Sequence, residues 1–215
     1  PAQPLSGATG LGVSTPRRVG VFGGAFDPPH LAHAALVRSA IEALHLDEVR
    51  VLPTGQAWHR SGSLSDAAHR LAMTRLAFAD VPQVVVDERE IRRAGPSYTV
   101  DTLHEIASEQ PGAQLYLLIG DDQRRSLPGW HRIGEIGRLA IICAAARDPQ
   151  VAAWHGGEPS GAELPGPVIQ PLPMPLMPIS ATDIRERISC QAKVAHLVAP
   201  AVERYIHEHH LYSPS

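Results

Sequence analysis

Six short runs of apolar and β-branched residues recur along the chain, and most of them are separated by stretches with helical spacing. They are RRVGVFG at 17–23, EVRVLP at 48–53, QVVVDE at 83–88, QLYLLIG at 114–120, LAIICAA at 139–145 and PVIQPL at 167–172. Runs of this length and composition are typical of buried strands. Because consecutive parallel strands need a crossover that a helix usually supplies, the alternation predicts an α/β protein whose parallel sheet is covered by helices.

The first two connections carry signals for where a helix begins. Pro28 and Pro29 cannot continue a helix from before, and an apolar stripe that includes Val37 follows them, so a helix is expected from near His30. In the second connection Ser63 is followed three residues later by Asp66, which is capping-box-like spacing. We therefore expect the second helix to begin at this serine.

Three further helices are expected later in the chain. The sequence TVDTLHEIAS at 99–108 is helical in pattern, with Thr99 as a suitable N-cap residue. Ser180 and Asp183 have capping-box spacing at the start of another helix. The last helix is expected after Pro200, where apolar residues again share one face.

Composition limits the class of protein. The 215 residues suffice for one well-buried domain, which we expect at 19–212 after a flexible leader at 1–18 that is rich in Gly, Ser, Thr and Pro. No apolar run is long enough for a membrane span, and two cysteines make no disulfide framework, so a cytoplasmic protein without a membrane partner is expected. A formal net charge of -3 argues against binding of nucleic acid. The sequence leaves the oligomeric state open and admits a homo-oligomer.

The stretch GVFGGAFDPPHLAH at 20–33 contains the first candidate site. Gly23 and Gly24 end the first expected strand, where a residue without Cβ lets a phosphate approach the backbone. The free amides and the positive dipole of a helix N-terminus favour an anion there. His30 and His33 are three residues apart, so both imidazoles face the same side of the helix and can reach one phosphate oxygen.

This stretch also has three other interpretations. A dinucleotide fingerprint needs G-x-G-x-x-G, which the sequence does not supply. The pair His30 and His33 could bind a metal, but no third ligand of clear spacing accompanies them. Both histidines could also be ordinary helix-start residues, although two of them beside a glycine pair weaken that interpretation.

The stretch PISATDIRER contains the second candidate site, some 150 residues away. Ser180, Thr182 and the free amides of a helix start can donate hydrogen bonds to phosphate oxygens. Arg185 can bind the same oxygens with its planar guanidinium. Taken alone, the stretch is more typical of a capped helix with a surface arginine than of a phosphate site.

The two stretches together carry a resemblance to a known family. GVFGGAFDPPHLAH closely resembles the G-G-x-F-D-P-x-H-x-G-H signature of the nucleotidylyltransferase superfamily, and in detail that of the bacterial nicotinate-nucleotide adenylyltransferases. The second stretch resembles the I-S-S/A-T-x-I-R motif with which this family holds the triphosphate of ATP. Ala32 departs from the signature, which usually has glycine there. The resemblance covers residues 18–212 and implies a Rossmann-like, doubly wound parallel sheet with helices on both faces.

The resemblance also implies roles for individual residues. The residues expected to act in catalysis are His30, His33 and Arg185. Those expected to bind ATP and its phosphates are Gly23, Gly24, Ala25, Phe26, Arg60, Ser180, Thr182 and Asp122. Those expected to bind the nicotinate nucleotide are Thr99, Trp130 and His131. Asp122 matches the ribose-binding aspartate of a G-x-D motif, with Asp121 beside it as an alternative, and Trp130 matches a ring that stacks on nicotinate.

The implied reaction joins the AMP moiety of ATP to nicotinate mononucleotide and releases nicotinate adenine dinucleotide and pyrophosphate. Mg²⁺ is expected to arrive on the phosphates of ATP, without a metal site built from protein side chains alone. Two other functions stay open: a related nucleotidylyltransferase that acts on nicotinamide mononucleotide or phosphopantetheine, and a nucleotide sensor on the same fold. The C-terminal sequence YIHEHHLY at 205–212 has no H-E-x-x-H spacing, so we assign it a structural or solvated role.

Overall fold

The strands form one parallel sheet. The computed structural model describes residues 15–55, 64–146, 167–175 and 177–213, and for residues 121, 122 and 146 the backbone alone. The strands are β1 (Arg18–Gly24), β2 (Glu48–Pro53), β3 (Val84–Val86), β4 (Gln114–Ile119), β5 (Ala140–Ala146) and β6 (Ile169–Pro173). Each lies within or beside one of the six apolar runs, so the predicted strands are confirmed. β1 begins at Arg18, the last residue of the expected leader, whose residues 1–14 lie outside the described ranges.

The strand order is β3-β2-β1-β4-β5-β6, and every neighbouring pair is parallel. The chain starts in the middle, builds outward through β2 and β3, then returns to the other side of β1 with β4. The predicted doubly wound sheet is therefore confirmed. In such a sheet a crevice opens at the carboxyl ends of the strands where the order reverses, here β1 and β4.

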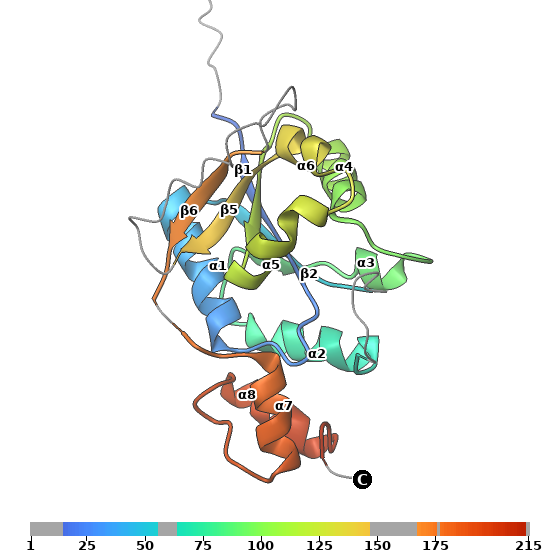
Figure 1. The fold of residues 1–215 in the computed structure, drawn as a ribbon, viewed down its shortest axis with the longest axis vertical. Helices are drawn as coiled ribbons and strands as arrows, with labels where there is room; N and C mark the ends of the chain where they lie inside the picture. The colour runs from blue at the N-terminus through green and yellow to red at the C-terminus, as the bar shows by residue number, and fades with distance from the viewer. Residues whose placement is uncertain (1–14, 56–63, 147–166, 176, 214–215) are drawn as a thin grey trace, which may run out of the picture.

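Helices cover both faces of this sheet (Figure 1). The helices are α1 (Leu31–Leu44), α2 (Ala67–Ala77), α3 (Arg89–Arg92), α4 (Thr99–Glu109), α5 (Asp121–Ser126), α6 (Ile133–Leu139), α7 (Ala181–Ser189) and α8 (Pro200–Glu208), with a short 3-10 helix, η1 (Leu127–Gly129). In Figure 1, α7 and α8 form the lower end of the molecule. Within the described residues, no helix combines the length and the apolar character that crossing a bilayer requires.

The alternation of side chains along β4 explains why there are two cores. Leu115 and Leu117 are buried against α4 and α6, whereas Tyr116 and Leu118 are buried on the opposite face, in the core that includes residues of α1, α2, α7 and α8. Successive side chains of a strand point to opposite faces, so a strand with no polar alternation must be covered on both.

One predicted helix start and one predicted N-cap residue are wrong, whereas the helix starts predicted near His30, at Thr99 and after Pro200 are confirmed. α2 begins at Ala67, because Asp66 is its N-cap and accepts from the Ala68 amide at 2.8 Å; the predicted start, Ser63, lies outside the described residues. The N-cap of α4 is Tyr98 rather than Thr99, because the Tyr98 carbonyl accepts the first helical hydrogen bonds. The Ser180 hydroxyl of α7 accepts from the amide three residues on at 3.1 Å, as predicted.

A substitution at Gly55 tests how closely the segment after β2 approaches the backbone of α3. A Cβ at Gly55 would lie 2.1 Å from the Glu90 carbonyl oxygen, so Gly55→Ala must push two backbone segments apart. We expect this variant to lower the free energy of unfolding by about 2 kcal/mol or more, measured by urea denaturation. Gly134→Ala is the matched control, because a Cβ there meets nothing within 4 Å. Equal stability of the two variants would contradict the close approach.

Candidate active site

Two neighbouring cavities open at the carboxyl ends of β1 and β4. The larger has a volume of about 350 Å³ and is lined by the turn after β1, by α1 and by the start of α7. The smaller, of about 140 Å³, is lined by residues before and within α4, by residues after β4 and by α6. Both cavities are lined by residues 23–25 and by Gln123, so they meet at the end of β1.

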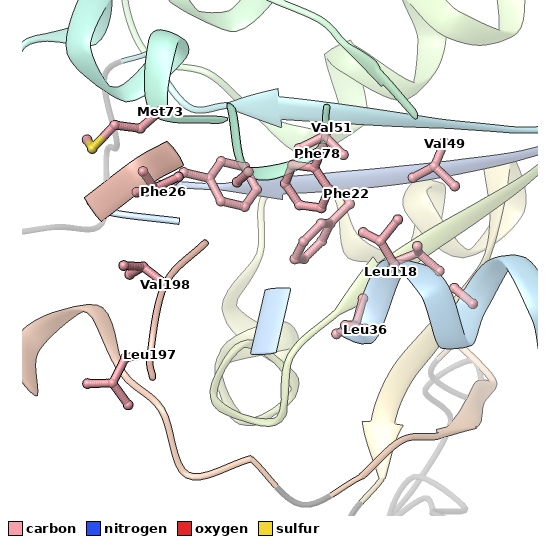
Figure 2. Packing of buried hydrophobic residues seen from close by; sticks show 14 of the residues in the cluster. Phe22, Phe26, Leu36, Val49, Val51, Met73, Phe78, Leu118, Leu197 and Val198 are labelled. Atoms are coloured by element: carbon pink, nitrogen blue, oxygen red, sulfur yellow. The ribbon is translucent and has the colours of Figure 1, made fainter. Parts of the chain in front are cut away.

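The turn after β1 is fixed by a buried aromatic ring. Phe26 has a left-handed backbone conformation with φ of 49°, and its side chain is only 2% exposed. The ring packs edge-on against Phe22 at 5.4 Å and Phe78 at 6.4 Å between centroids (Figure 2). A Cβ at Gly24 would lie 2.9 Å from the same ring, so the glycine is required by this packing. The packing of the Phe26 ring therefore fixes the position of Gly23 and Gly24, which line both cavities.

The two histidines lie together at the start of α1 and line the larger cavity. His30 is the N-cap residue, and its backbone N–H donates to His33 Nδ1 at 3.1 Å. The imidazole rings are stacked with centroids 3.6 Å apart. Because His33 Nδ1 accepts this hydrogen bond, a neutral His33 carries its proton on Nε2, as the hydrogen-bond pattern assigns it.

Burial makes both histidines neutral at physiological pH. It lowers the pKa of His30 from 6.5 to about 4. Burial also lowers the pKa of His33 well below its usual value, and a charge on His30 would lower it further. His30 Nδ1 is buried and has no hydrogen-bond partner among the described residues. In this structure the pair thus supplies neutral N–H donors rather than two positive charges.

The second sequence motif lies on the same cavity. Ser180, Thr182 and Arg185 line it together with the two histidines. One guanidinium nitrogen of Arg185, Nη1, donates to the Asp27 carbonyl at 2.7 Å, and Nη2 donates to Thr182 Oγ1 at 3.3 Å. The structure thus joins two stretches that are some 150 residues apart in the chain.

The expected pyridine-nucleotide residues line the smaller cavity. Thr99, Trp130 and His131 all contribute to its wall. The Trp130 indole donates to Ser126 Oγ at 3.2 Å, and the centroids of the His131 and Tyr98 rings are 4.5 Å apart. The N-terminus of α4 borders this cavity, so its positive end favours a negative group there.

Some expected site residues are not placed by the structure. Arg60 lies outside the described residues. The backbone of Asp122 is in the first turn of α5, beside the place where the cavities meet, but its side chain is outside the described part, as is that of Asp121. Ala32, where the family signature has glycine, lines the larger cavity.

Arg70 lines neither cavity but supports the turn that does, and the sequence interpretation missed it. Its side chain is 2% exposed, and its Nη1 donates to the carbonyls of Ala25 at 2.9 Å and Thr54 at 2.8 Å. Its Nε donates to the Ser65 carbonyl at 3.0 Å. The guanidinium thus ties the turn after β1 to the loop after β2 and to the segment before α2. Its place in helical register with the buried Met73 could have revealed it.

Two residues that do line the cavities were also missed. Gln123 lies where the cavities meet; its Oε1 accepts from the Gly120 amide at 3.2 Å, and its Nε2 is 3.5 Å from the Gly23 carbonyl. Glu90 lines the smaller cavity and accepts from the Thr102 hydroxyl at 2.8 Å, while burial raises the pKa of its carboxyl group. Glu90 stands in the charged stretch DEREIRR, where no sequence signal separates a buried carboxylate from solvated ones.

Comparison with known proteins agrees with this geometry. Residues 21–187 match the cytidylyltransferase-like family. A protein of Albidiferax ferrireducens, named probable nicotinate-nucleotide adenylyltransferase, is 53% identical over 196 residues, which are 91% of this chain and 98% of that protein. A protein of Methylibium petroleiphilum with the same name is 38% identical and covers 95% of this chain and 96% of its own.

The chain belongs to the nicotinate-nucleotide adenylyltransferases. Its fold is also that of more distant members of this family. A Plasmodium falciparum nicotinic acid mononucleotide adenylyltransferase solved with NaAD has a TM-score of 0.71 at 17% identity, covering 91% of this chain and 97% of that one. The same Plasmodium enzyme solved with APC has a TM-score of 0.68 at 16% identity.

The depressed pKa of His30 predicts how the stability of this adenylyltransferase depends on pH. Between the folded value of about 4 and the usual 6.5, the unfolded chain binds the proton more strongly than the folded one. The free energy of unfolding should therefore fall as the pH is lowered through this window, with this histidine contributing about 2 kcal/mol between pH 7 and pH 4.5.

The measurement is urea denaturation across this pH range on the wild type and on His30→Asn, which should lose part of the drop. The variant His196→Asn is the matched control, because His196 is exposed. If the pH curve of His30→Asn runs parallel to that of the wild type, the pKa of His30 is not depressed.

Proposed function

We propose that the larger cavity binds ATP and the smaller one binds nicotinate mononucleotide, with the reacting groups meeting at residues 23–25. The protein is a nucleotidyltransferase that joins the AMP moiety of ATP to nicotinate mononucleotide, giving nicotinate adenine dinucleotide and pyrophosphate. The observation that carries the assignment is that both phosphate-binding motifs line one cavity, which joins the cavity of Thr99 and Trp130.

The reaction needs placement and charge stabilisation more than a strong base. The phosphate of the mononucleotide is the nucleophile, and with a second pKa near 6 it is already mostly dianionic at neutral pH. It attacks the α-phosphorus of ATP, a new P–O bond forms, and the bond to the β-phosphate oxygen breaks as pyrophosphate leaves. Holding the two substrates in line at the end of β1 supplies a large part of the rate enhancement.

The histidines act as neutral hydrogen-bond donors to the oxygens of the reacting phosphate. His33 presents Nε2–H, because its Nδ1 is occupied by the His30 amide. His30 lines the same cavity and its Nδ1 is buried, so its other ring nitrogen, Nε2, is proposed to donate to the phosphate. Donors that are already oriented stabilise the charge that develops in the transition state without reorganisation.

Arg185, Ser180 and Thr182 hold the β- and γ-phosphates, and Arg60 is proposed to reach them from the loop after β2. The hydrogen bond to the Asp27 carbonyl keeps the Arg185 guanidinium at the cavity before ATP binds. An oriented guanidinium binds phosphate oxygens in a bidentate manner at a lower entropic cost than a free one.

The smaller cavity recognises the nicotinate group. Trp130 offers a ring for stacking on the pyridine, and the amides near Thr99 and His131 hold the carboxylate at the positive end of α4. Asp122 is proposed to bind the adenosine ribose through its two hydroxyls, with Asp121 as the alternative.

Mg²⁺ is proposed to enter as the MgATP complex, coordinated by phosphate oxygens and water. Within the described residues no group of three or more His, Cys, Asp and Glu side chains could hold a metal ion. The cytoplasmic location, the homo-oligomer and the lack of a nucleic-acid partner stay predictions.

Removing either histidine tests the catalytic assignment. His30→Ala and His33→Ala should each lower turnover about 100-fold or more, the scale of a lost transition-state donor, while the protein stays folded. The measurement is pyrophosphate release from ATP and nicotinate mononucleotide, with circular dichroism to check folding. His196→Ala, at an exposed position outside both cavities, should retain full activity. Near-normal turnover in both site variants would refute the role of the pair.

A substrate panel tests the smaller cavity. With MgATP, nicotinate mononucleotide should give a kcat/KM roughly 100-fold above that of nicotinamide mononucleotide, because the positive helix end favours the carboxylate. Phosphopantetheine should give no pyrophosphate. A preference for the amide would overturn the substrate assignment, and ATP binding without pyrophosphate release from any of the three would favour a nucleotide sensor.

A further inference from the structure

We propose that Tyr212, close to the end of the chain, is a positioning residue for the ATP site. Its hydroxyl group holds Asp27 in place, and through Asp27 it orients the Arg185 guanidinium and the turn that leads to His30. The inference deepens the proposed function and rests on it, because it concerns the cavity assigned there to ATP.

The first observation is a hydrogen bond that spans 185 positions in the sequence. The Tyr212 hydroxyl donates to Asp27 Oδ1 at 2.6 Å, and Asp27 is only 3% exposed. The other carboxylate oxygen accepts from the Ser65 amide at 3.0 Å. A buried carboxylate is stable only when its oxygens are hydrogen bonded, so the placement of Asp27 depends on the end of the chain.

The second observation is what Asp27 itself holds. Its carbonyl oxygen accepts from Arg185 Nη1 at 2.7 Å. Pro28 and Pro29 separate Asp27 from His30, and their rings restrict the backbone between them. A shift of Asp27 therefore reaches both the arginine proposed to bind the triphosphate and the histidine proposed to bind the reacting phosphate.

The hydroxyl group of Tyr212 stays a donor over the whole neutral pH range. Burial, and then the hydrogen bond to the negatively charged Asp27, raise the pKa of Tyr212 far above its usual value. The aromatic ring itself packs against the core that includes Phe22 and Phe26. Tyr212→Phe keeps this packing and removes only the hydroxyl group, so it separates positioning from packing.

The chain offers a matched control in the same C-terminal region. Tyr205, in α8, also uses its hydroxyl group to bond to a residue of another segment, His69 Nδ1 in α2, at 3.0 Å. It is not among the residues that line the two cavities. Tyr205→Phe therefore removes a comparable tertiary hydrogen bond without touching Asp27.

The experiment compares the wild type, Tyr212→Phe and Tyr205→Phe by steady-state pyrophosphate release and by thermal unfolding. Tyr212→Phe should lower kcat/KM for ATP about tenfold, the scale of a lost hydrogen bond to a charged group, and leave KM for nicotinate mononucleotide within about twofold. Tyr205→Phe should leave both kinetic parameters unchanged. A merely structural role would change thermal stability without this difference between the two substrates.

A double-mutant cycle with Asp27→Ala, which removes the acceptor of the Tyr212 hydroxyl, sharpens the test. If Tyr212 acts through Asp27, the double variant should lose little more kcat/KM for ATP than the more impaired single variant. Fully additive effects would overturn the proposal, as would equal kinetics for Tyr212→Phe and Tyr205→Phe, or equal losses toward both substrates.

Titration with a non-hydrolysable ATP analogue separates this inference from the proposed function. If the wild type binds the analogue but releases no pyrophosphate from ATP and nicotinate mononucleotide, the proposed function fails. The positioning role is then judged by the Kd for the analogue, which should rise about tenfold in Tyr212→Phe and stay unchanged in Tyr205→Phe. An unchanged Kd in Tyr212→Phe would overturn the inference whatever the reaction.

Discussion

Contacts with the core, with α2, with α7 and with Tyr212 hold the turn between β1 and α1 in place. The rest of the site depends on the position of this turn. The Phe26 ring is buried in the core, and the guanidinium of Arg70, in α2, donates to the Ala25 carbonyl. The Asp27 carbonyl accepts a hydrogen bond from Arg185 of α7, and the Asp27 carboxylate accepts one from the Tyr212 hydroxyl. These contacts fix the backbone of the glycine-containing turn, so the phosphate-binding geometry proposed for it is present before any ligand arrives.

The same burial sets the electrostatic character of the site. Two histidines stacked 3.6 Å apart in a poorly solvated place cannot both be protonated near neutral pH, so they offer N–H donors and no fixed charge. Positive charge comes from Arg185 across the cavity. A bound polyphosphate would favour the protonated form of an imidazole beside it, which makes the histidines responsive to the charge on the substrate.

The sequence predicted the fold nearly completely, because apolar runs and helical spacing are local patterns that tertiary contacts here reinforce. It also predicted that residues around His30 and around Ser180 serve one site, although the resemblance to a family, and not spacing, brought them together. It misplaced the start of α2 and the N-cap residue of α4, since the N-cap is set by the backbone conformation and hydrogen bonds at Asp66 and Tyr98, which the sequence pattern alone does not specify. Two of the residues it missed, Arg70 and Gln123, act through backbone carbonyls that are distant in the chain.

The sequence by itself thus determined the order of the strands along the chain, the faces of the helices and the residue types of a phosphate site. Only the tertiary structure decided which charged groups are buried and what they hold. Tyr212 illustrates the difference: its sequence context suggested a structural or solvated tail, yet its hydroxyl group reaches a buried carboxylate 185 positions away. The physical reason is that burial and hydrogen-bond partnership are properties of packed segments. Local sequence specifies the segments, and their packing specifies the partners.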